Sequence, residues 1–315
     1  MINLKSIIIQ SFIVLISLVS IELILRVINS DMKNYDIEMW RYANTLKTQD
    51  PVLGHKHVKN KEAILQGVKI KLNSEGMRSD EFDDNEKKIL FLGSSISLGW
   101  GIHQDDAYPE IIQKKLLSDS LEYKVLNGSI GNYNTYRYVN NFLSNHKNLN
   151  PELIVVNYFI NDAETLPINQ SNWLIKNSQL FATLTITYKK LSSKSGFDLK
   201  TYYRELYKDD NLSFMKMKES LLKLSKYSKE TSTPVLLTVI PDIHFLEDYP
   251  FNLIHTKMKD ISEELGFEYH DFLPSLEGIP FHELQIIRGD SHPNEMGHSK
   301  MGQSLYLRLK ELIIS

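Results

Sequence analysis

The sequence predicts one large α/β domain built on a parallel β-sheet, preceded by an apolar helix and a small, partly β extension. From residue 88 onward, short apolar runs alternate with stretches of helical periodicity. Such runs are typical of buried parallel strands, and alternating β and α units place helices on both faces of one sheet. We therefore divide the chain into residues 1–30, residues 31–87 and residues 88–315, with an insertion at about 163–213 in the last part.

The first part is predicted to be a transmembrane anchor. Residues 6–21 carry no charge, and the apolar run continues to residue 28. At about 1.5 Å per residue, a helix of this length crosses a hydrocarbon core of about 30 Å. Glu22 and Arg26 are four residues apart, so they can pair near the headgroups. A cleaved signal peptide is the alternative; the run is longer than a usual signal core, and no small-x-small cleavage site follows it.

The extension at residues 31–87 is polar and has several turn signals. Residues 68–72 follow Gly67 and alternate apolar and polar side chains, which predicts a half-exposed strand. This part is expected to pack beside the main domain.

The main domain is predicted from five apolar runs and the helical stretches between them. The expected strands are residues 89–92, 123–126, 153–159, 235–240 and 269–273. The expected helices are residues 108–117, 136–143, 215–227 and 254–265, with a last helix marked by Met301, Leu305, Leu309 and Leu312. The connection between Asp162 and Ser213 is too long for an ordinary loop, so we expect a partly helical cap or substrate-binding lobe.

Composition excludes several functional classes. The net charge of −3 and the pI near 6.4 do not indicate a nucleic-acid partner. The chain has no cysteine, which excludes disulfides, zinc–thiolate sites and lipid attachment through cysteine. We expect neither a metal nor a cofactor.

Candidate catalytic residues follow the predicted strands, where ligands bind in open parallel sheets. Ser95 comes directly after the first strand, and a serine nucleophile needs a histidine base. His292 can serve as that base, with Asp290 holding its imidazole in the required tautomer. Ser97 is the rival nucleophile. A metal site of Asp290, His292 and His298 is a second alternative, although it would need a further ligand.

Four segments, taken together and in this order, resemble the active-site blocks of the SGNH (GDSL-like) hydrolases: GSSISLG at residues 93–99, NGSIGN at 127–132, FIND at 159–162 and DSHPN at 290–294. The resemblance covers residues 88–315 and implies a flavodoxin-like sheet with helices on both faces. It also implies acyl transfer through Ser95, His292 and Asp290. The N-terminal anchor and residues 73–78 are similar to membrane-tethered bacterial members of the family.

The same resemblance implies an oxyanion hole formed by the N–H of Ser95, a backbone N–H of the second block and the side-chain amide of Asn161. Spacing from Asn127 places the family's glycine position at Asn132, whereas Gly131 is the adjacent glycine; both remain candidates. Asparagine tolerates a positive φ better than most residues, so Asn132 can hold such a turn. Ser94 departs from the family pattern, which usually has an aspartate there that helps to hold the nucleophile turn.

These observations predict a serine esterase that removes acyl groups, most plausibly acetyl, from a carbohydrate or cell-envelope substrate. If a sugar hydroxyl replaces water in the second step, the protein is an O-acyltransferase; a non-catalytic carbohydrate-binding subunit is a third alternative. The insertion has five aromatic residues that can either stack on sugar rings in an acceptor or glycan site above Ser95 or serve only to pack a cap: Trp173, Phe181, Tyr188, Tyr202 and Tyr203. We expect the catalytic domain outside the cytoplasm, on the periplasmic side.

Overall fold

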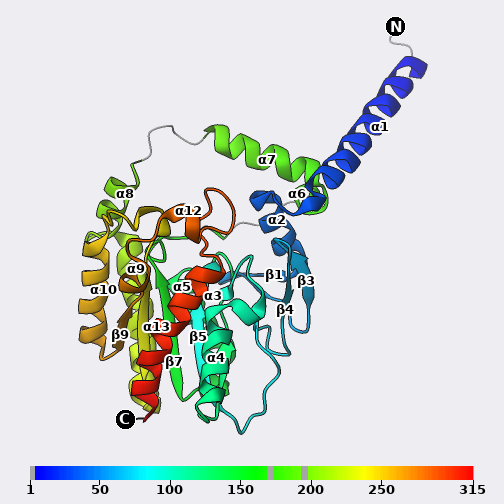
Figure 1. Ribbon diagram of the computed structural model, residues 1–315. Coiled ribbons are helices and arrows are strands. Elements are labelled where there is room, and N and C mark those ends of the chain that lie inside the picture. The colour runs from blue at the N-terminus through cyan, green and yellow to red at the C-terminus, as the bar shows by residue number, and fades with distance from the viewer. Residues whose placement is uncertain (1–3, 169–172, 193–197, 315) are drawn as a thin grey trace.

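The centre of the protein is a five-stranded parallel sheet, seen in a computed structural model that describes residues 4–168, 173–192 and 198–314 (Figure 1). The strand order is β6-β5-β7-β8-β9, with every neighbouring pair parallel. The strands are β5 (Lys87–Gly93), β6 (Tyr123–Asn127), β7 (Leu153–Phe159), β8 (Val235–Ile240) and β9 (Glu268–Asp271). Counted along the chain this is the 2-1-3-4-5 order of flavodoxin-like sheets, so the predicted fold class is confirmed.

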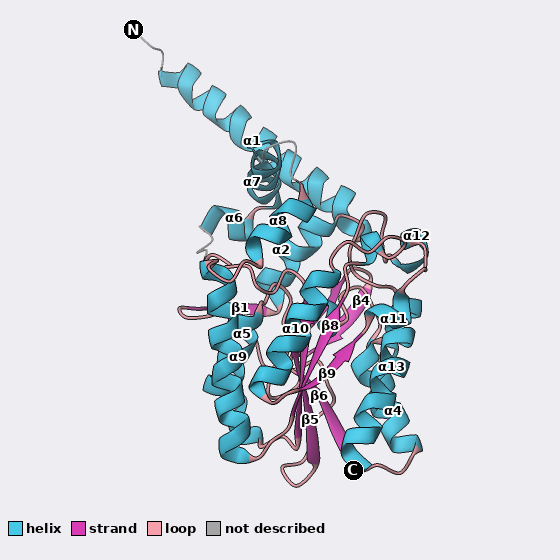
Figure 2. Cartoon of the chain, turned by 90° about the vertical axis from the view of Figure 1, so that its left-hand side faces the viewer, coloured by secondary structure: helices cyan, strands magenta, loops and turns pink. Residues whose placement is uncertain are grey.

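Helices cover both faces of the sheet, as Figure 2 shows in side view. One face carries α5 (Thr135–Asn141), α9 (Leu212–Thr231) and α10 (Asn252–Leu265), and the other carries α4 (Tyr108–Ser118), α11 (Leu273–Leu276) and α13 (Glu295–Ile314). Every residue of β7 and β8 is buried between these layers. That burial explains why both strands are almost entirely apolar, with Asn157 and Thr238 as the only polar residues.

The last helix packs against the helix that follows the first strand of the sheet. The contact is specific, because the backbone N–H of Tyr108 in α4 donates to Nδ1 of His298 in α13 over 3.1 Å. This packing brings the loop before α13 to the carboxyl edge of the sheet. The proposed base and acid are in that loop.

The predicted strand at residues 269–273 is wrong at its end. β9 stops at Asp271, whose carboxylate accepts the N–H of Leu273 over 2.8 Å and so caps the start of α11. Pro274 lies in the first turn of that helix, where its missing N–H costs nothing. Of the two apolar residues that extended the strand pattern, Phe272 precedes the helix as its cap and Leu273 is its first residue.

The extension contains a helix, α2 (Tyr35–Thr45), that its mixed polar sequence did not predict. Two antiparallel hairpins follow: β1 (Lys47–Asp50) with β2 (Gly54–His57), and β3 (Glu62–Leu65) with β4 (Val68–Lys71). The expected strand at residues 68–72 is thus confirmed. Tyr42 of α2 and residues of the second hairpin form a small core that also contains Leu98 and Trp100 of the main domain. The extension is therefore packed directly on the segment after Ser95.

The N-terminal helix α1 (Leu4–Ile28) projects away from the domain (Figure 1). It is long and apolar enough to cross a membrane, and none of its residues is buried. Arg26 pairs with Glu22 over 2.7 Å, as predicted. The insertion is partly helical, as predicted, with α6 (Trp173–Asn177), α7 (Gln179–Ser192) and α8 (Leu199–Leu206).

The remaining described elements are short. They are the helices α3 (Ser95–Leu98) and α12 (Phe281–Leu284), the 3-10 turns Asn29–Asp31, Gln104–Asp106, Lys147–Leu149 and Ile243–Phe245, and a π-helical turn at Phe142–His146.

Candidate active site

Ser95, His292 and Asp290 form one hydrogen-bonded chain at the carboxyl edge of the sheet. Ser95 begins α3 directly after β5, and its Oγ lies 2.7 Å from Nε2 of His292. Nδ1 of His292 lies 2.6 Å from Oδ1 of Asp290. An ionised carboxylate can only accept, so Nδ1 carries the proton and Nε2 is free to accept the Ser95 hydroxyl. This is the tautomer that a general base needs.

The two alternatives from the sequence do not share this geometry. Ser97 is fully buried in α3, and its carbonyl accepts from the side-chain amide of Asn127. His298 is buried between α13 and α4, where burial lowers its pKa to about 3 and its Nδ1 accepts the Tyr108 N–H. Within residues 4–168, 173–192 and 198–314, no three His, Asp or Glu side chains are placed to hold a metal ion.

Arg78, which lies in the extension after the second hairpin, holds the turn that follows Ser95. Its guanidinium donates to the carbonyls of Leu98 (2.9 Å), Gly99 (2.6 Å) and Ile102 (2.6 Å). Burial lowers the pKa of Arg78 to about 10, so the side chain stays cationic at neutral pH. These bonds hold the backbone of residues 98–102, just after Ser95, in place.

A cavity of about 160 Å³ lies beside Ser95, and Asn132, Asn161 and His292 also line it. Asn132 has a φ of +63°, so the turn is left-handed at this residue. The N–H of Gly131 donates to the hydroxyl of Tyr42 over 3.0 Å. The N–H of Gly131 is thus already bonded within the protein. Of the two candidates in the second block, Asn132 is the one at the cavity.

Buried partners from the extension fix the position of Gly131. Tyr42 is fully buried, and its hydroxyl lies 2.6 Å from Nε2 of His57. Burial lowers the pKa of His57 to about 3, so its ring is neutral, and Nδ1 must donate to the carbonyl of Gly76. Nε2 therefore accepts from Tyr42, which leaves the Tyr42 oxygen free to accept from Gly131.

The carbonyl of Gly131, on the opposite side of this peptide, contacts one lysine and one histidine ring. The Gly131 carbonyl accepts from Nζ of Lys47 over 2.6 Å and lies 3.1 Å from Nε2 of His55. Nothing in the local sequence pattern pointed to Tyr42, His57 or Lys47, because each acts through a contact with a distant part of the chain.

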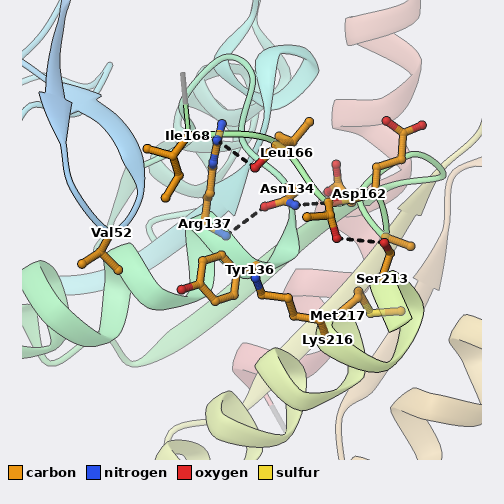
Figure 3. Close-up of a pocket in the computed structure, with 13 residues that line it drawn as sticks. Val52, Asn134, Tyr136, Arg137, Asp162, Leu166, Ile168, Ser213, Lys216 and Met217 are labelled. Atoms are coloured by element: carbon orange, nitrogen blue, oxygen red, sulfur yellow. Dashed lines mark hydrogen bonds between the residues drawn. The ribbon is translucent and has the colours of Figure 1, made fainter. Parts of the chain in front are cut away.

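Arg137 links the Asn132 turn to the segment that follows Asn161. Its guanidinium donates to the carbonyls of Asn132 (3.0 Å) and Pro167 (2.9 Å). Asn134 holds the same segment through a 2.5 Å bond to the Glu164 carbonyl. Figure 3 shows Asn134, Arg137 and Leu166 at a small cavity. This cavity has a volume of about 70 Å³ and shares Asn134, Glu164 and Leu166 with the cavity at Ser95. One guanidinium thus binds both the Asn132 turn and the segment that follows Asn161.

Helix α2 supplies a wall of the cavity. Tyr35 and Met39 line it, and the Tyr35 ring lies 6.0 Å from the ring of His292. Met39 and Asn132 also line a larger groove, of about 780 Å³, which continues between α2 and helices α6 and α7. The site is therefore a small polar cavity that opens into a broad groove.

The aromatic residues of the insertion do not gather over Ser95. Trp173 lines the broad groove. Tyr203 is buried against Phe251, with ring centroids 5.1 Å apart, and Tyr202 packs on Tyr203. Phe181 and Tyr188 are exposed on α7, outside both cavities. Of the five, only Trp173 lines the groove next to the cavity at Ser95, and Tyr202 and Tyr203 serve in packing.

Comparison with known proteins gives structural likeness only. No family model matches the sequence, and no curated protein matches it. The structure is similar to that of TesA, at 15% identity and a TM-score of 0.48 over 72% of this chain and 99% of that one. It is similar to the psychrotrophic esterase EstA from Pseudoalteromonas sp. (16%, TM-score 0.47, 73% of this chain and 100% of that one). Axe2, an acetylxylan esterase from Geobacillus stearothermophilus, gives 17% identity and a TM-score of 0.46, over 70% of this chain and 93% of that one.

Proposed function

We propose that the protein is a serine esterase that works through an acyl-Ser95 intermediate. The observation that carries the proposal is the continuous hydrogen-bonded chain from Ser95 through His292 to Asp290. His292 takes the hydroxyl proton as Ser95 attacks the ester carbonyl, and it then returns that proton to the leaving alcohol. In the second half, His292 activates water, which releases the acid and regenerates Ser95.

Negative charge develops on the carbonyl oxygen during each attack. The N–H of Ser95, the N–H of Asn132 and the side-chain amide of Asn161 are the donors proposed for it. Each such donor typically contributes about 2.7–4 kcal/mol to the transition state. Arg137 and Tyr42 act as positioning residues, because they hold the carbonyl of Asn132 and the N–H of Gly131.

The size of the site favours a short acyl group on a larger alcohol. Pockets that hold drug-sized ligands have volumes of about 300–1,000 Å³. The cavity at Ser95, of about 160 Å³, is smaller than this, whereas the adjoining groove, of about 780 Å³, lies within this range. We therefore propose acetyl as the acyl group and a carbohydrate of the cell envelope as the alcohol. Trp173 in the groove offers a face for a sugar ring.

Membrane anchoring through α1 is part of the proposal. The carboxylate of Glu22 in α1 accepts the N–H groups of Gln179 (3.0 Å) and Leu180 (2.8 Å) and the hydroxyl of Ser178 (2.8 Å). These bonds cap α7, so α1 contributes to the folded insertion. This supports an uncleaved anchor over a cleaved signal peptide. We further propose that the domain lies outside the cytoplasm, on the periplasmic side.

The test is a product analysis with purified full-length protein and acetylated oligosaccharides. Free acetate and deacetylated sugar are expected, and both should disappear in Ser95→Ala. Transfer of acetyl to an added sugar as the main product would replace the esterase by the O-acyltransferase. Sugar binding without any turnover, unchanged in Ser95→Ala, would support the non-catalytic subunit instead.

A further inference from the structure

Helix α7 has two different faces. Ala182, Thr185, Ile186 and Lys189 line the broad groove beside α2. Phe181, Leu184, Tyr188 and Leu191 recur at intervals of three and four residues, so they share another side of the helix. Leu184 is 56% exposed, Tyr188 73% and Leu191 82%. The helix therefore carries a stripe of large apolar side chains that the rest of the described chain does not cover.

The position of this stripe is set by α1. Glu22 caps the first residues of α7, and the side-chain amide of Gln179 donates to the carbonyl of Leu25 over 3.4 Å. Glu22 is the first charged residue after the uncharged run at residues 6–21. If that run occupies the hydrocarbon core, Glu22 and the start of α7 lie at its boundary. From there α7 leaves α1 and runs across the domain (Figure 1).

Charge also favours a bilayer surface. Residues 173–192 contain three lysines and no acidic residue. Lys190 pairs with Asp36 on α2, whereas Lys176 and Lys189 are exposed at the rim of the groove, one on each of the two helices. Trp173 and Leu174 of α6 are also exposed, at 74% and 44%. Aromatic and leucine side chains flanked by lysines are typical of helices that lie in the headgroup region of anionic membranes.

We propose that α7 lies in the interface of the same bilayer that holds α1, with the stripe Phe181, Leu184, Tyr188 and Leu191 inserted at the level of the upper acyl chains. This inference rests on the proposed anchor. Since the other side of α7 lines the groove that leads to Ser95, the active site is then held close to the membrane surface. The esters it receives are those presented at the bilayer surface.

The absence of native cysteine makes a direct test possible with single-cysteine variants of the full chain. Leu184→Cys and Tyr188→Cys are labelled with the fluorophore NBD and reconstituted in vesicles of phosphatidylcholine and phosphatidylglycerol, with and without nitroxide-labelled lipid. Val19→Cys in α1 reports on the anchor. Leu307→Cys in α13 is the matched control, since this leucine is 64% exposed and lies on the helix far from α1 (Figure 1).

We expect blue-shifted emission and strong nitroxide quenching at positions 19, 184 and 188, with neither at position 307. Quenching at position 19 combined with water-like emission at 184 and 188 would overturn the interfacial helix and leave the anchor intact. Water-like emission at position 19 would overturn the anchor and with it this inference. Neither result depends on turnover at Ser95, so the esterase chemistry is judged separately.

Discussion

Gly131→Ala is expected to damage the active site although Gly131 donates nothing to substrate. A Cβ at this residue would lie 2.6 Å from Cε1 of Tyr42, a fully buried ring. The two atoms must separate by about 0.8 Å to reach the 3.4 Å of ordinary contact. Tyr42 is held by His57, so the displacement falls largely on the turn that carries Asn132. Losing one aligned oxyanion donor lowers kcat by about 10²–10³.

The assay compares kcat and KM for p-nitrophenyl acetate in the wild type, Gly131→Ala and Asn132→Gly. Glycine adopts the +63° φ of residue 132 readily and keeps its N–H, so Asn132→Gly should retain kcat within a few fold. Thermal unfolding checks that Gly131→Ala remains folded, with a loss of about 1–3 kcal/mol for the overpacked site. A wild-type kcat in folded Gly131→Ala, or a hundredfold loss in Asn132→Gly, would refute the assignment of the Asn132 N–H.

Three further variants probe the same site and its support. Asn161→Ala should lower kcat by about 10²–10³ with little change in KM, measured by steady-state kinetics; an unchanged kcat would remove Asn161 from the oxyanion hole. Asp290→Asn should lower kcat by about 10⁴, because the imidazole then adopts the wrong tautomer; a small loss would mean that another group orients His292. Burial holds the pKa of His298 at about 3, compared with 6.5 in the unfolded chain. The contribution of the neutral ring to the free energy of unfolding is therefore fully present above pH 6.5 and is lost as the pH falls towards 3. Urea unfolding should show that His298 accounts for a loss of about 2–3 kcal/mol in the free energy of unfolding between pH 7 and pH 4.5, so the loss should be smaller in His298→Asn. An equal loss in His298→Asn would contradict the assignment of this pH dependence to His298.

The sheet could be predicted from the sequence because its central strands are buried on both sides. Continuous apolar runs at β5, β7 and β8 leave little ambiguity about their type. Helix α2 could not be predicted in this way. Its buried residues, such as Ile37 and Tyr42, lie among charged ones, and Glu38 is also buried, because its carboxylate accepts the N–H of Gln66 and pairs with Arg41.

The site residues also fall into two groups, those that short sequence segments predict and those that only distant contacts reveal. Ser95, His292 and Asp290 could be proposed because they lie in short segments with a fixed order along the chain. The choice between Gly131 and Asn132 required the bond from Tyr42, which is 89 residues away in sequence. Arg78 and Arg137 were likewise missed, because arginines that bind backbone carbonyls have no local sequence signature.

The most direct test of the account is covalent labelling of Ser95. Purified full-length protein is treated with a fluorophosphonate, and the adduct is located by peptide mass spectrometry. We predict one adduct per chain, on Ser95, absent in Ser95→Ala, retained in Ser97→Ala and greatly slowed in His292→Ala. Undiminished labelling of Ser95→Ala, or an adduct on Ser97, would contradict the proposed nucleophile.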